Sequence, residues 1–388
     1  MMGSPLRSTG VLALAQALNL SAAVVSVTVS AQAANSVAPN PTFSTVPYGW
    51  QFAAAMVLTW PASGLMKTWG RKNVFMLGTG LLGLSGVSGF VAMESGQFAL
   101  LCLAHALLGA YAATASFYRF AATDGLDEHQ QASALSWVVA GGVLGALLGP
   151  WLADRLKSQT GFADFSWCYG SLSLLALLNL ALLWLWTPQP TPATQAREPG
   201  TLQRAHRTRA WIAVLAAAWA YLAMNLLMVQ ASMHLQGLCS FESMSSAIQA
   251  HVLAMFLPSF FTGRLIRQLG APLVILAGGI LLVLACATPL WRTDDEATRA
   301  GLVLLGVGWN FLYVGGCALL ATSTQGKDSY RWQGVNDTVI AVCATLGAFA
   351  PARLFFLWGW ALTNQMVMTG TGIVLLVCVW GLAHRQSA

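Results

Sequence analysis

Long and almost uninterrupted apolar segments dominate this sequence, and short polar segments separate them. About 20 apolar residues are needed for a helix to cross the hydrocarbon core of a bilayer. The strands of a membrane barrel would instead alternate apolar and polar residues, which these segments do not. The pattern therefore predicts an all-α membrane protein with twelve transmembrane helices. The predicted spans are 11–33, 47–66, 73–93, 97–120, 131–153, 167–187, 211–236, 245–266, 271–291, 300–322, 334–356 and 362–383.

The composition supports this class and argues against others. Hydrophobic residues make up 56% of the chain and charged residues 8%, whereas a soluble domain carries about 25% charged residues. The seven cysteines show no paired or CxxC spacing, so neither a disulfide framework nor a zinc knuckle is indicated. Because no phosphate-binding glycine loop is present in the sequence, we expect neither an enzyme nor an ATP-driven pump, and no bound cofactor.

The basic residues predict the orientation of the helices. Of the 19 Lys and Arg residues, 14 fall in the termini and loops of one side, and the positive-inside rule places that side in the cytoplasm with both termini. The first span also resembles a signal peptide, because Arg7 and an apolar stretch precede Ala31-Gln32-Ala33. An uncleaved first helix is favoured, since cleavage would leave eleven spans and remove the repeat described next.

The chain has the organisation of an internal repeat. A polar segment, 188–210, separates a predicted six-helix half, 1–187, from a second one, 211–388. The loops 63–72 and 262–270 follow the second span of each half, and both combine glycine with basic residues. Corresponding loops in two six-helix halves imply parallel repeats, which in transporters rock around a substrate site near the middle of the membrane.

Two motifs resemble the major facilitator superfamily. They are Gly70-Arg71-Lys72, in the loop after the second span, and the glycines of the fifth span, which ends in Gly149-Pro150. Lys67 stands where the superfamily carries an acidic residue that contacts the start of the eleventh helix. Asp337 lies near the predicted start of that helix, so either a charge-swapped Lys67–Asp337 contact forms or Asp337 caps its own helix.

Four further motifs resemble the CcoA-like branch of this superfamily. They are Met224-x-x-x-Met228, His251-x-x-x-Met255-Phe, the segment 258–264 and the segment 306–310. The branch includes bacterial copper importers and riboflavin importers of the RfnT type. The resemblance therefore implies a secondary transporter with twelve helices and leaves two substrates open.

The spacing of four residues predicts a metal relay. Met224 and Met228 share one face of the seventh span, and His251 and Met255 share one face of the eighth. With a rise of 1.5 Å per residue, the four lie about 9–18 Å below the outer surface. Thioether and imidazole groups favour Cu(I). Methionine is also a common gap filler in apolar helices, but a histidine at that depth is a functional candidate by default.

Other polar residues of the spans are secondary candidates. His105 either lines the substrate pathway or bonds a neighbouring helix. Asn225 and Asn310 are expected to bond between helices while lying near the pathway. Arg119 is expected to pair with the acidic cluster 124–128 as a gate or topology element, and Arg71 to make contacts of the loop.

The sequence as a whole predicts a transporter of the bacterial inner membrane that imports copper through Met224, Met228, His251 and Met255. Copper would be the transported ion, and a periplasmic or cytoplasmic copper chaperone is the expected partner. The alternative is a small organic solute such as riboflavin. In that case His251 would hydrogen-bond the solute, and tryptophans would stack on its flat ring.

Overall fold

The computed structural model describes residues 5–40, 43, 46–188, 204–235, 241–292, 294–324 and 327–383. Within these ranges the chain forms helices and no strand. The chain divides into two compact units, Met1–Asp124 with Gly141–Pro190, and Gly125–Ala140 with Thr191–Ala388. The second unit thus contains the first part of the predicted fifth span, whereas the sequence predicts the whole of that span in the first half.

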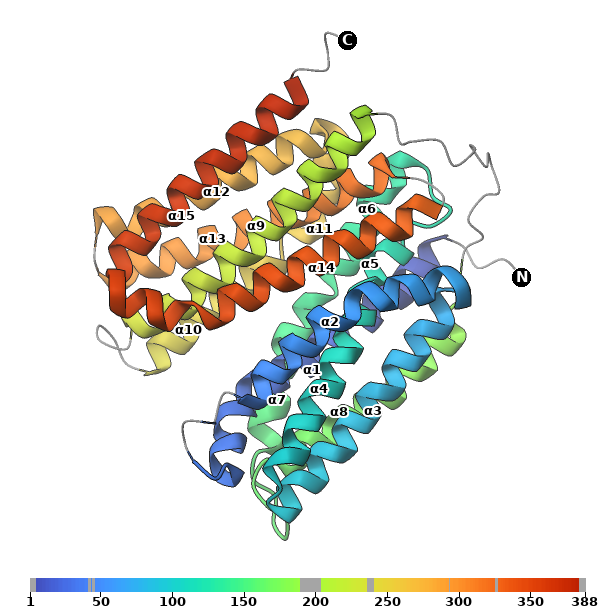
Figure 1. Ribbon diagram of the computed structural model, residues 1–388, viewed down its shortest axis with the longest axis vertical. Coiled ribbons are helices and arrows are strands. Elements are labelled where there is room, and N and C mark those ends of the chain that lie inside the picture. Colours follow the sequence, from blue (N-terminus) through green and yellow to red (C-terminus); the bar gives the residue numbers. More distant parts are fainter. Residues whose placement is uncertain are drawn as a thin grey trace. The chain divides into compact units, whose positions relative to one another are not determined.

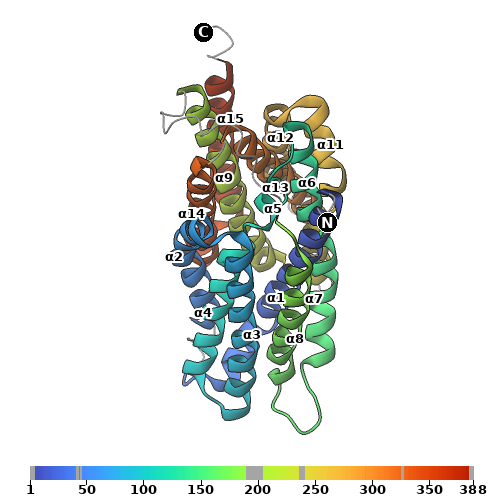
Figure 2. The same ribbon diagram turned by 90° about the vertical axis from the view of Figure 1, so that its right-hand side faces the viewer.

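The first unit consists of helices packed along their lengths. α3 packs against both α4 and α8, α2 packs against α4, and α1 packs against α7 (Figures 1 and 2). The helices are α1 (Pro5–Val37), α2 (Val46–Trp69), α3 (Arg71–Ser95), α4 (Phe98–Ala115), the short α5 (Tyr118–Ala121), α7 (Gly142–Leu156) and α8 (Ser166–Leu185).

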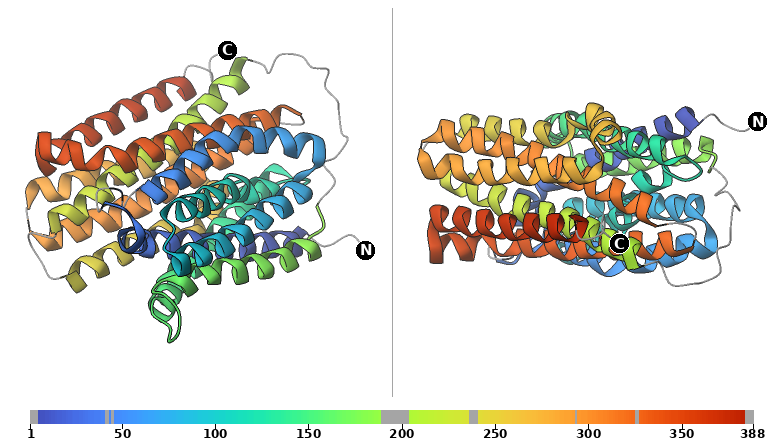
Figure 3. Two further views of the ribbon diagram at one scale, coloured as in Figure 1. Left: turned by 60° about the horizontal axis from the view of Figure 1, so that its bottom comes forward. Right: turned by 90° about the horizontal axis from the view of Figure 1, so that it is seen from above.

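The second unit is built around α13 (Asp295–Ser323), which packs against α9, α10 and α12. Both views of Figure 3 show α12 and α13 side by side. The remaining helices are α6 (Glu128–Ala140), which packs against α11, α9 (Arg204–Leu235), α10 (Phe241–Phe256), α11 (Ser259–Leu269), α12 (Ala271–Trp291), α14 (Lys327–Phe349) and α15 (Pro351–Ala383).

The helices cover the predicted spans, but several begin or end at other residues, most clearly the last two. Nine helices in the described part of the chain are long and apolar enough to cross a membrane by length and composition. The predicted span 334–356 is wrong in its limits, because α14 ends at Phe349 and Pro351 opens α15. Asp337 therefore lies well inside α14, which begins at Lys327, so the expectation that Asp337 caps its own helix is wrong.

The same turn occurs once in each unit. Gly70 joins α2 to α3 with φ 80° and ψ 155°, and Gly270 joins α11 to α12 with φ 85° and ψ 151°. Positive φ values of this kind strain any residue that has a Cβ atom. The two corresponding loops of the sequence thus adopt one backbone conformation, as an internal repeat requires.

A second pair of glycines marks equivalent helix crossings. A Cβ atom on Gly109 of α4 would lie 2.1 Å from the carbonyl oxygen of Gln51 on α2. A Cβ atom on Gly306 of α13 would lie 2.6 Å from the carbonyl oxygen of His251 on α10. Each glycine lets two backbones approach closely, which is a common use of small residues in membrane helices.

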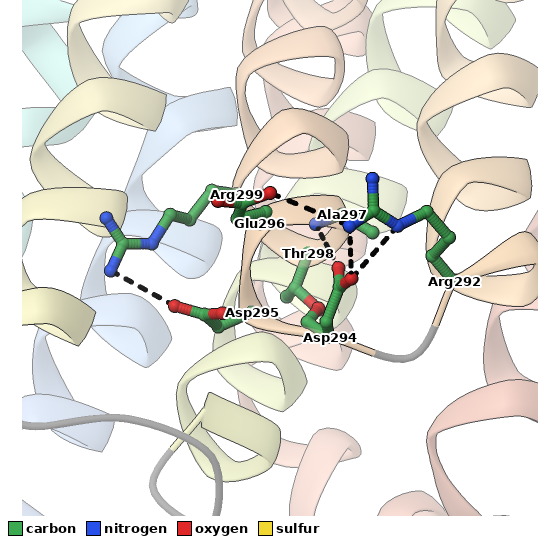
Figure 4. Close-up of polar contacts among 7 residues, drawn as sticks. All are labelled: Arg292, Asp294, Asp295, Glu296, Ala297, Thr298 and Arg299. Atoms are coloured by element: carbon green, nitrogen blue, oxygen red, sulfur yellow. Dashed lines mark hydrogen bonds and ion pairs between the residues drawn. The ribbon is translucent and has the colours of Figure 1, made fainter.

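The start of α13 is capped by a charged cluster (Figure 4). Asp294 accepts a hydrogen bond of 2.9 Å from the backbone N–H of Ala297, as an N-cap residue does. Arg292 donates to the same carboxylate, and Arg299 lies 3.4 Å from Asp295. The N–H group of Ala297 and the neighbouring Arg292 lower the pKa of Asp294. This cluster defines where α13 begins.

Candidate substrate-binding site

His251 lies wholly buried on α10 and bonds the backbone of α13. Its Nδ1 is 2.7 Å from the carbonyl oxygen of Leu302. Because a carbonyl can only accept, Nδ1 carries the proton and the neutral ring presents Nε2 as a hydrogen-bond acceptor. Nε2 has no hydrogen-bond partner among the described residues. His251 therefore anchors α10 to α13 with one nitrogen and leaves the other open.

The structure gives no support to the four-residue relay. Met224 and Met255 are buried, whereas Met228 is partly exposed. The relay requires α9 and α10 to face each other, but α10 packs on α13 and makes few contacts with α9. Each predicted pair does lie on a single helix, α9 for the methionines and α10 for His251 and Met255. The spacing within a pair does not determine which neighbouring helix that pair faces.

Four aromatic side chains from α9, α10 and α13 form a cluster, and α10 and α13 are the two helices that His251 joins. The rings of Trp309 and Tyr313 stack, with centroids 4.8 Å apart and planes 22° apart. Tyr221 meets both rings edge-on at 5.2 Å, and Phe256 meets Trp309 edge-on at 5.6 Å. Trp309 lies near the middle of α13, which is the level at which transporters of this architecture bind their substrates. We refer to these four residues as the aromatic cluster.

Trp309 also carries an open polar group. The side chain is 1% exposed, and its Nε1–H has no acceptor among the described residues. Leaving a buried donor without a partner costs about 1–3 kcal/mol. Native proteins pair most of their buried polar groups. The cluster therefore combines flat apolar surfaces with one uncompensated donor.

Sequence reasoning missed the aromatic cluster, although part of it was visible. Trp309 and Tyr313 are separated by four residues in an apolar span, the same spacing that drew attention to the methionine pairs. The contributions of Tyr221 and Phe256 depend on how α9 and α10 pack against α13, which no spacing shows.

The two asparagines bond between helices. Nδ2 of Asn310 donates to the carbonyl of Met255 and to the hydroxyl of Ser259, and Oδ1 of Asn310 accepts from the hydroxyl of Thr262. These bonds span the break between α10 and α11, where Pro258 lacks an N–H group. Asn225 of α9 donates to the carbonyl of Ala344 on α14. Asn310 thus supports the helix that carries His251 and Phe256.

His105, the candidate histidine of the first unit, has partners on both ring nitrogens. Nδ1 lies 3.2 Å from Oε1 of Gln51 on α2, and Nε2 lies 2.9 Å from the hydroxyl of Tyr169 on α8. Ser26 of α1 donates to the same Gln51 oxygen. Because an amide oxygen accepts, Nδ1 donates and Nε2 accepts from tyrosine. This closed network holds α1, α2, α4 and α8 together.

The loop between α2 and α3 is fixed by its basic residues. Nε and Nη2 of Arg71 donate to both carboxylate oxygens of Asp124, at 2.6 and 3.0 Å. Burial raises the pKa of Asp124, and Arg71 opposes that rise. Lys72 donates to the carbonyls of Trp184 and Trp186 at the end of α8, a helix end that favours a cation. Arg71 is thus a structural contact of this loop.

The other three residues predicted to make gating or loop contacts are Arg119, Lys67 and Asp337. Arg119 donates to the carbonyl of Ser116 and lies over the ring of Phe120, 4.5 Å from its centroid. Lys67 is exposed in the first unit, and Asp337 is buried in the second, where its Oδ1 accepts from Asn336. The contact between Lys67 and Asp337 stays a prediction.

The chain has helices of membrane length in two compact units, and aromatic and polar side chains gather near the middle of one helix. This arrangement is typical of membrane transporters that bind their substrate between helices. The model of the Major Facilitator Superfamily matches residues 9–295. The chain therefore belongs to the Major Facilitator Superfamily and is a multi-pass secondary transporter, not an enzyme.

The chain is also similar to individual proteins of known function or structure. The riboflavin transporter RfnT of Brucella anthropi is 29% identical over 389 residues, which cover 98% of this chain and 97% of that protein. The human organic anion transporter MFSD10 has a similar structure, with a TM-score of 0.81, 15% identity, and coverage of 97% of this chain and 100% of that chain. The proton:xylose symporter XylE reaches a TM-score of 0.80 at 13% identity and covers 97% of this chain and 95% of its own. At such identities the two structures support the fold alone.

Proposed function

We propose that this chain transports riboflavin, or a solute with the same flat heteroaromatic ring system, across the bacterial cytoplasmic membrane by alternating access. The observation that carries the proposal is the similarity to a riboflavin transporter over nearly the full length of both chains. That similarity does not support the predicted import of copper or the predicted copper chaperone. The positive-inside distribution of Lys and Arg supports cytoplasmic termini.

The aromatic cluster supports this substrate class. The ring faces of Tyr221, Trp309 and Tyr313 offer offset or edge-on contacts that suit a flat, conjugated solute. Apolar and aromatic walls with a small number of polar groups are typical of sites for small organic molecules. A sugar would instead require many hydrogen-bonding side chains around the site.

Uptake of radiolabelled riboflavin tests the proposal. The wild type, Trp309→Leu and the control Trp380→Leu are expressed in riboflavin-auxotrophic cells that lack their own transporter. Trp380 is 65% exposed on α15, so its replacement removes an equally large ring away from the cluster. We expect saturable uptake by the wild type and the control, and a loss of at least tenfold in Trp309→Leu at equal membrane levels.

The same cells are tested for uptake of copper under reducing conditions. Copper uptake above that of empty cells, without riboflavin uptake, would overturn the proposal and return the Met224, Met228, His251 and Met255 relay as the working hypothesis. Riboflavin uptake that survives in Trp309→Leu would remove the aromatic cluster from the transport pathway.

A further inference from the structure

Two buried polar groups of the second unit are open and complementary. Nε1–H of Trp309 is a donor, and Nε2 of His251 is an acceptor because Nδ1 of that ring is occupied by the Leu302 carbonyl. Neither has a hydrogen-bond partner among the described residues. One donor and one acceptor are what a ligand with an adjacent carbonyl and N–H group would satisfy.

Both groups lie along one helix contact, that of α10 with α13. His251 bonds Leu302, and Trp309 lies seven residues further along α13, two turns away on the same face and about 10 Å along the axis. Phe256, which meets Trp309 edge-on, lies five residues after His251, about 8 Å along α10. Because helical side chains incline toward the N-terminus of their helix, the Trp309 ring leans along α13 toward Leu302, the residue that His251 bonds.

Other buried polar atoms of the described residues are open as well, among them Nε2 of His234 and Nε1 of Trp360, but the polar residue next to Trp309 is paired. Asn310, one residue after Trp309, uses its amide hydrogens and its amide oxygen in three bonds. The His251 side chain bonds the Leu302 carbonyl through Nδ1, which fixes the tautomer. An open donor and an open acceptor that are both buried, on the helix contact that also carries Phe256 and Trp309 of the aromatic cluster, point to a ligand.

We propose that His251 and Trp309 recognise the polar edge of the transported ring, which rests on the proposed function. Nε2 of His251 accepts from a ring N–H, and Nε1–H of Trp309 donates to a ring carbonyl, while Tyr221 and Tyr313 contact the ring faces. The substrate class is a flat heterocycle with an imide edge, an N–H group flanked by carbonyls, as in the pyrimidine ring of riboflavin. His251 thereby becomes the residue that determines specificity for the imide.

Titration of the purified protein with two flavins tests this assignment. Riboflavin and N3-methylriboflavin are both fluorescent, but methylation removes the imide N–H and leaves the carbonyls. A site built to pair a ligand N–H rejects the analogue that lacks it, so we expect the wild type to bind riboflavin at least tenfold more tightly. In His251→Leu the two affinities should become equal within about twofold, because riboflavin loses its partner.

Trp309→Phe keeps an aromatic ring and removes only the donor. Both flavins retain their carbonyls, so both should bind more weakly by a similar factor, about fivefold to tenfold, with the ratio between them unchanged. His206→Leu and Trp380→Phe are the matched controls, since His206 lies near the start of α9 and Trp380 is exposed on α15. Both controls should keep the affinities of the wild type.

The possible failures are distinguishable. If the wild type binds both flavins equally, or if His251→Leu still discriminates, the assignment is overturned while the proposed function stands. If the wild type binds neither flavin, the proposed function fails, and this assignment with it. Should His251→Leu not yield monodisperse protein, His251→Met removes the nitrogen acceptor at similar volume, and the ratio measured for the wild type decides in any case.

Discussion

The two units each bury a histidine, and the two histidines differ in what they leave unpaired. His105 of α4 bonds side chains through both ring nitrogens, whereas His251 of α10 bonds one backbone carbonyl and leaves Nε2 open. Both lie next to a close helix crossing, at Gly109 and at Gly306. A buried histidine is therefore not a functional group by its depth alone, and its hydrogen bonds decide its role.

The largest expected effect concerns what the two regions share. Gly109→Val and Gly306→Val would each place side-chain atoms against a backbone carbonyl, at crossings where even a Cβ atom would lie 2.1 and 2.6 Å from oxygen. Backbone cannot yield as a flexible side chain does, so the helices must separate. We expect both variants to fail to reach normal levels of folded protein, as measured by size-exclusion fluorescence. Gly64→Ala is the control, because nothing lies near that position.

Normal yields of both valine variants would show that the helices at these crossings move apart without loss, and a normal yield of only one would remove the equivalence between the two histidine regions.

The second prediction concerns the different roles of the two histidines, a structural one for His105 and a ligand-binding one for His251. His105→Leu strands the bonding groups of Gln51 and Tyr169 and should lower the free energy of unfolding by about 1–3 kcal/mol. His251→Leu strands only the Leu302 carbonyl, and should lower stability less while weakening riboflavin binding about tenfold. Thermal unfolding and flavin titration on the same preparations measure both quantities. Equal losses of stability with unchanged flavin binding in both variants would contradict the distinction.

A milder substitution makes the two histidines alike. Tyr169→Phe removes the hydroxyl that Nε2 of His105 accepts from, which leaves that nitrogen open as in His251. Hydrogen bonds between membrane helices contribute about 0.6 kcal/mol on average, so we expect a fall in melting temperature of a few degrees at most. Flavin affinity should stay that of the wild type. A change in flavin affinity would place the His105 network in the substrate pathway.

The smallest effect is expected at the exposed cap of α13. The lowered pKa of Asp294 means that folding favours its carboxylate, so the stabilisation is fully present above the ordinary carboxyl pKa of about 3.9 and is lost as the pH falls through the lower value of the folded protein. Asp294→Ala should therefore melt slightly below the wild type at pH 7 and together with it in strong acid. A difference that persists unchanged in acid would rule out the carboxylate as its source.

The sequence predicted the helices well because long apolar runs specify membrane spans. The loops around Gly70 and Gly270 were also matched as repeats, and the structure gives them one conformation. The limits of the eleventh span were wrong, because Pro351 and not the end of the apolar run separates α14 from α15. The role suggested for Asp337 as a helix cap is wrong because α14 begins at Lys327, well before that residue.

The candidate site was only partly predictable. His251 was selected from its depth, and the structure confirms that it is buried, but its partner is a backbone carbonyl that carries no signal in the sequence. The methionine relay depended on α9 facing α10, whereas α10 packs mainly on α13, so the structure gives the relay no support. Likewise, Tyr221 and Phe256 join Trp309 only through the packing of three helices.

The central claim is that this chain moves riboflavin through the aromatic cluster of its second unit. Riboflavin uptake by auxotrophic cells that express the wild type or Trp309→Leu, at equal membrane levels, tests it most directly. The account predicts saturable uptake by the wild type and a loss of at least tenfold in the variant. Uptake by the wild type no greater than that of empty cells would contradict it.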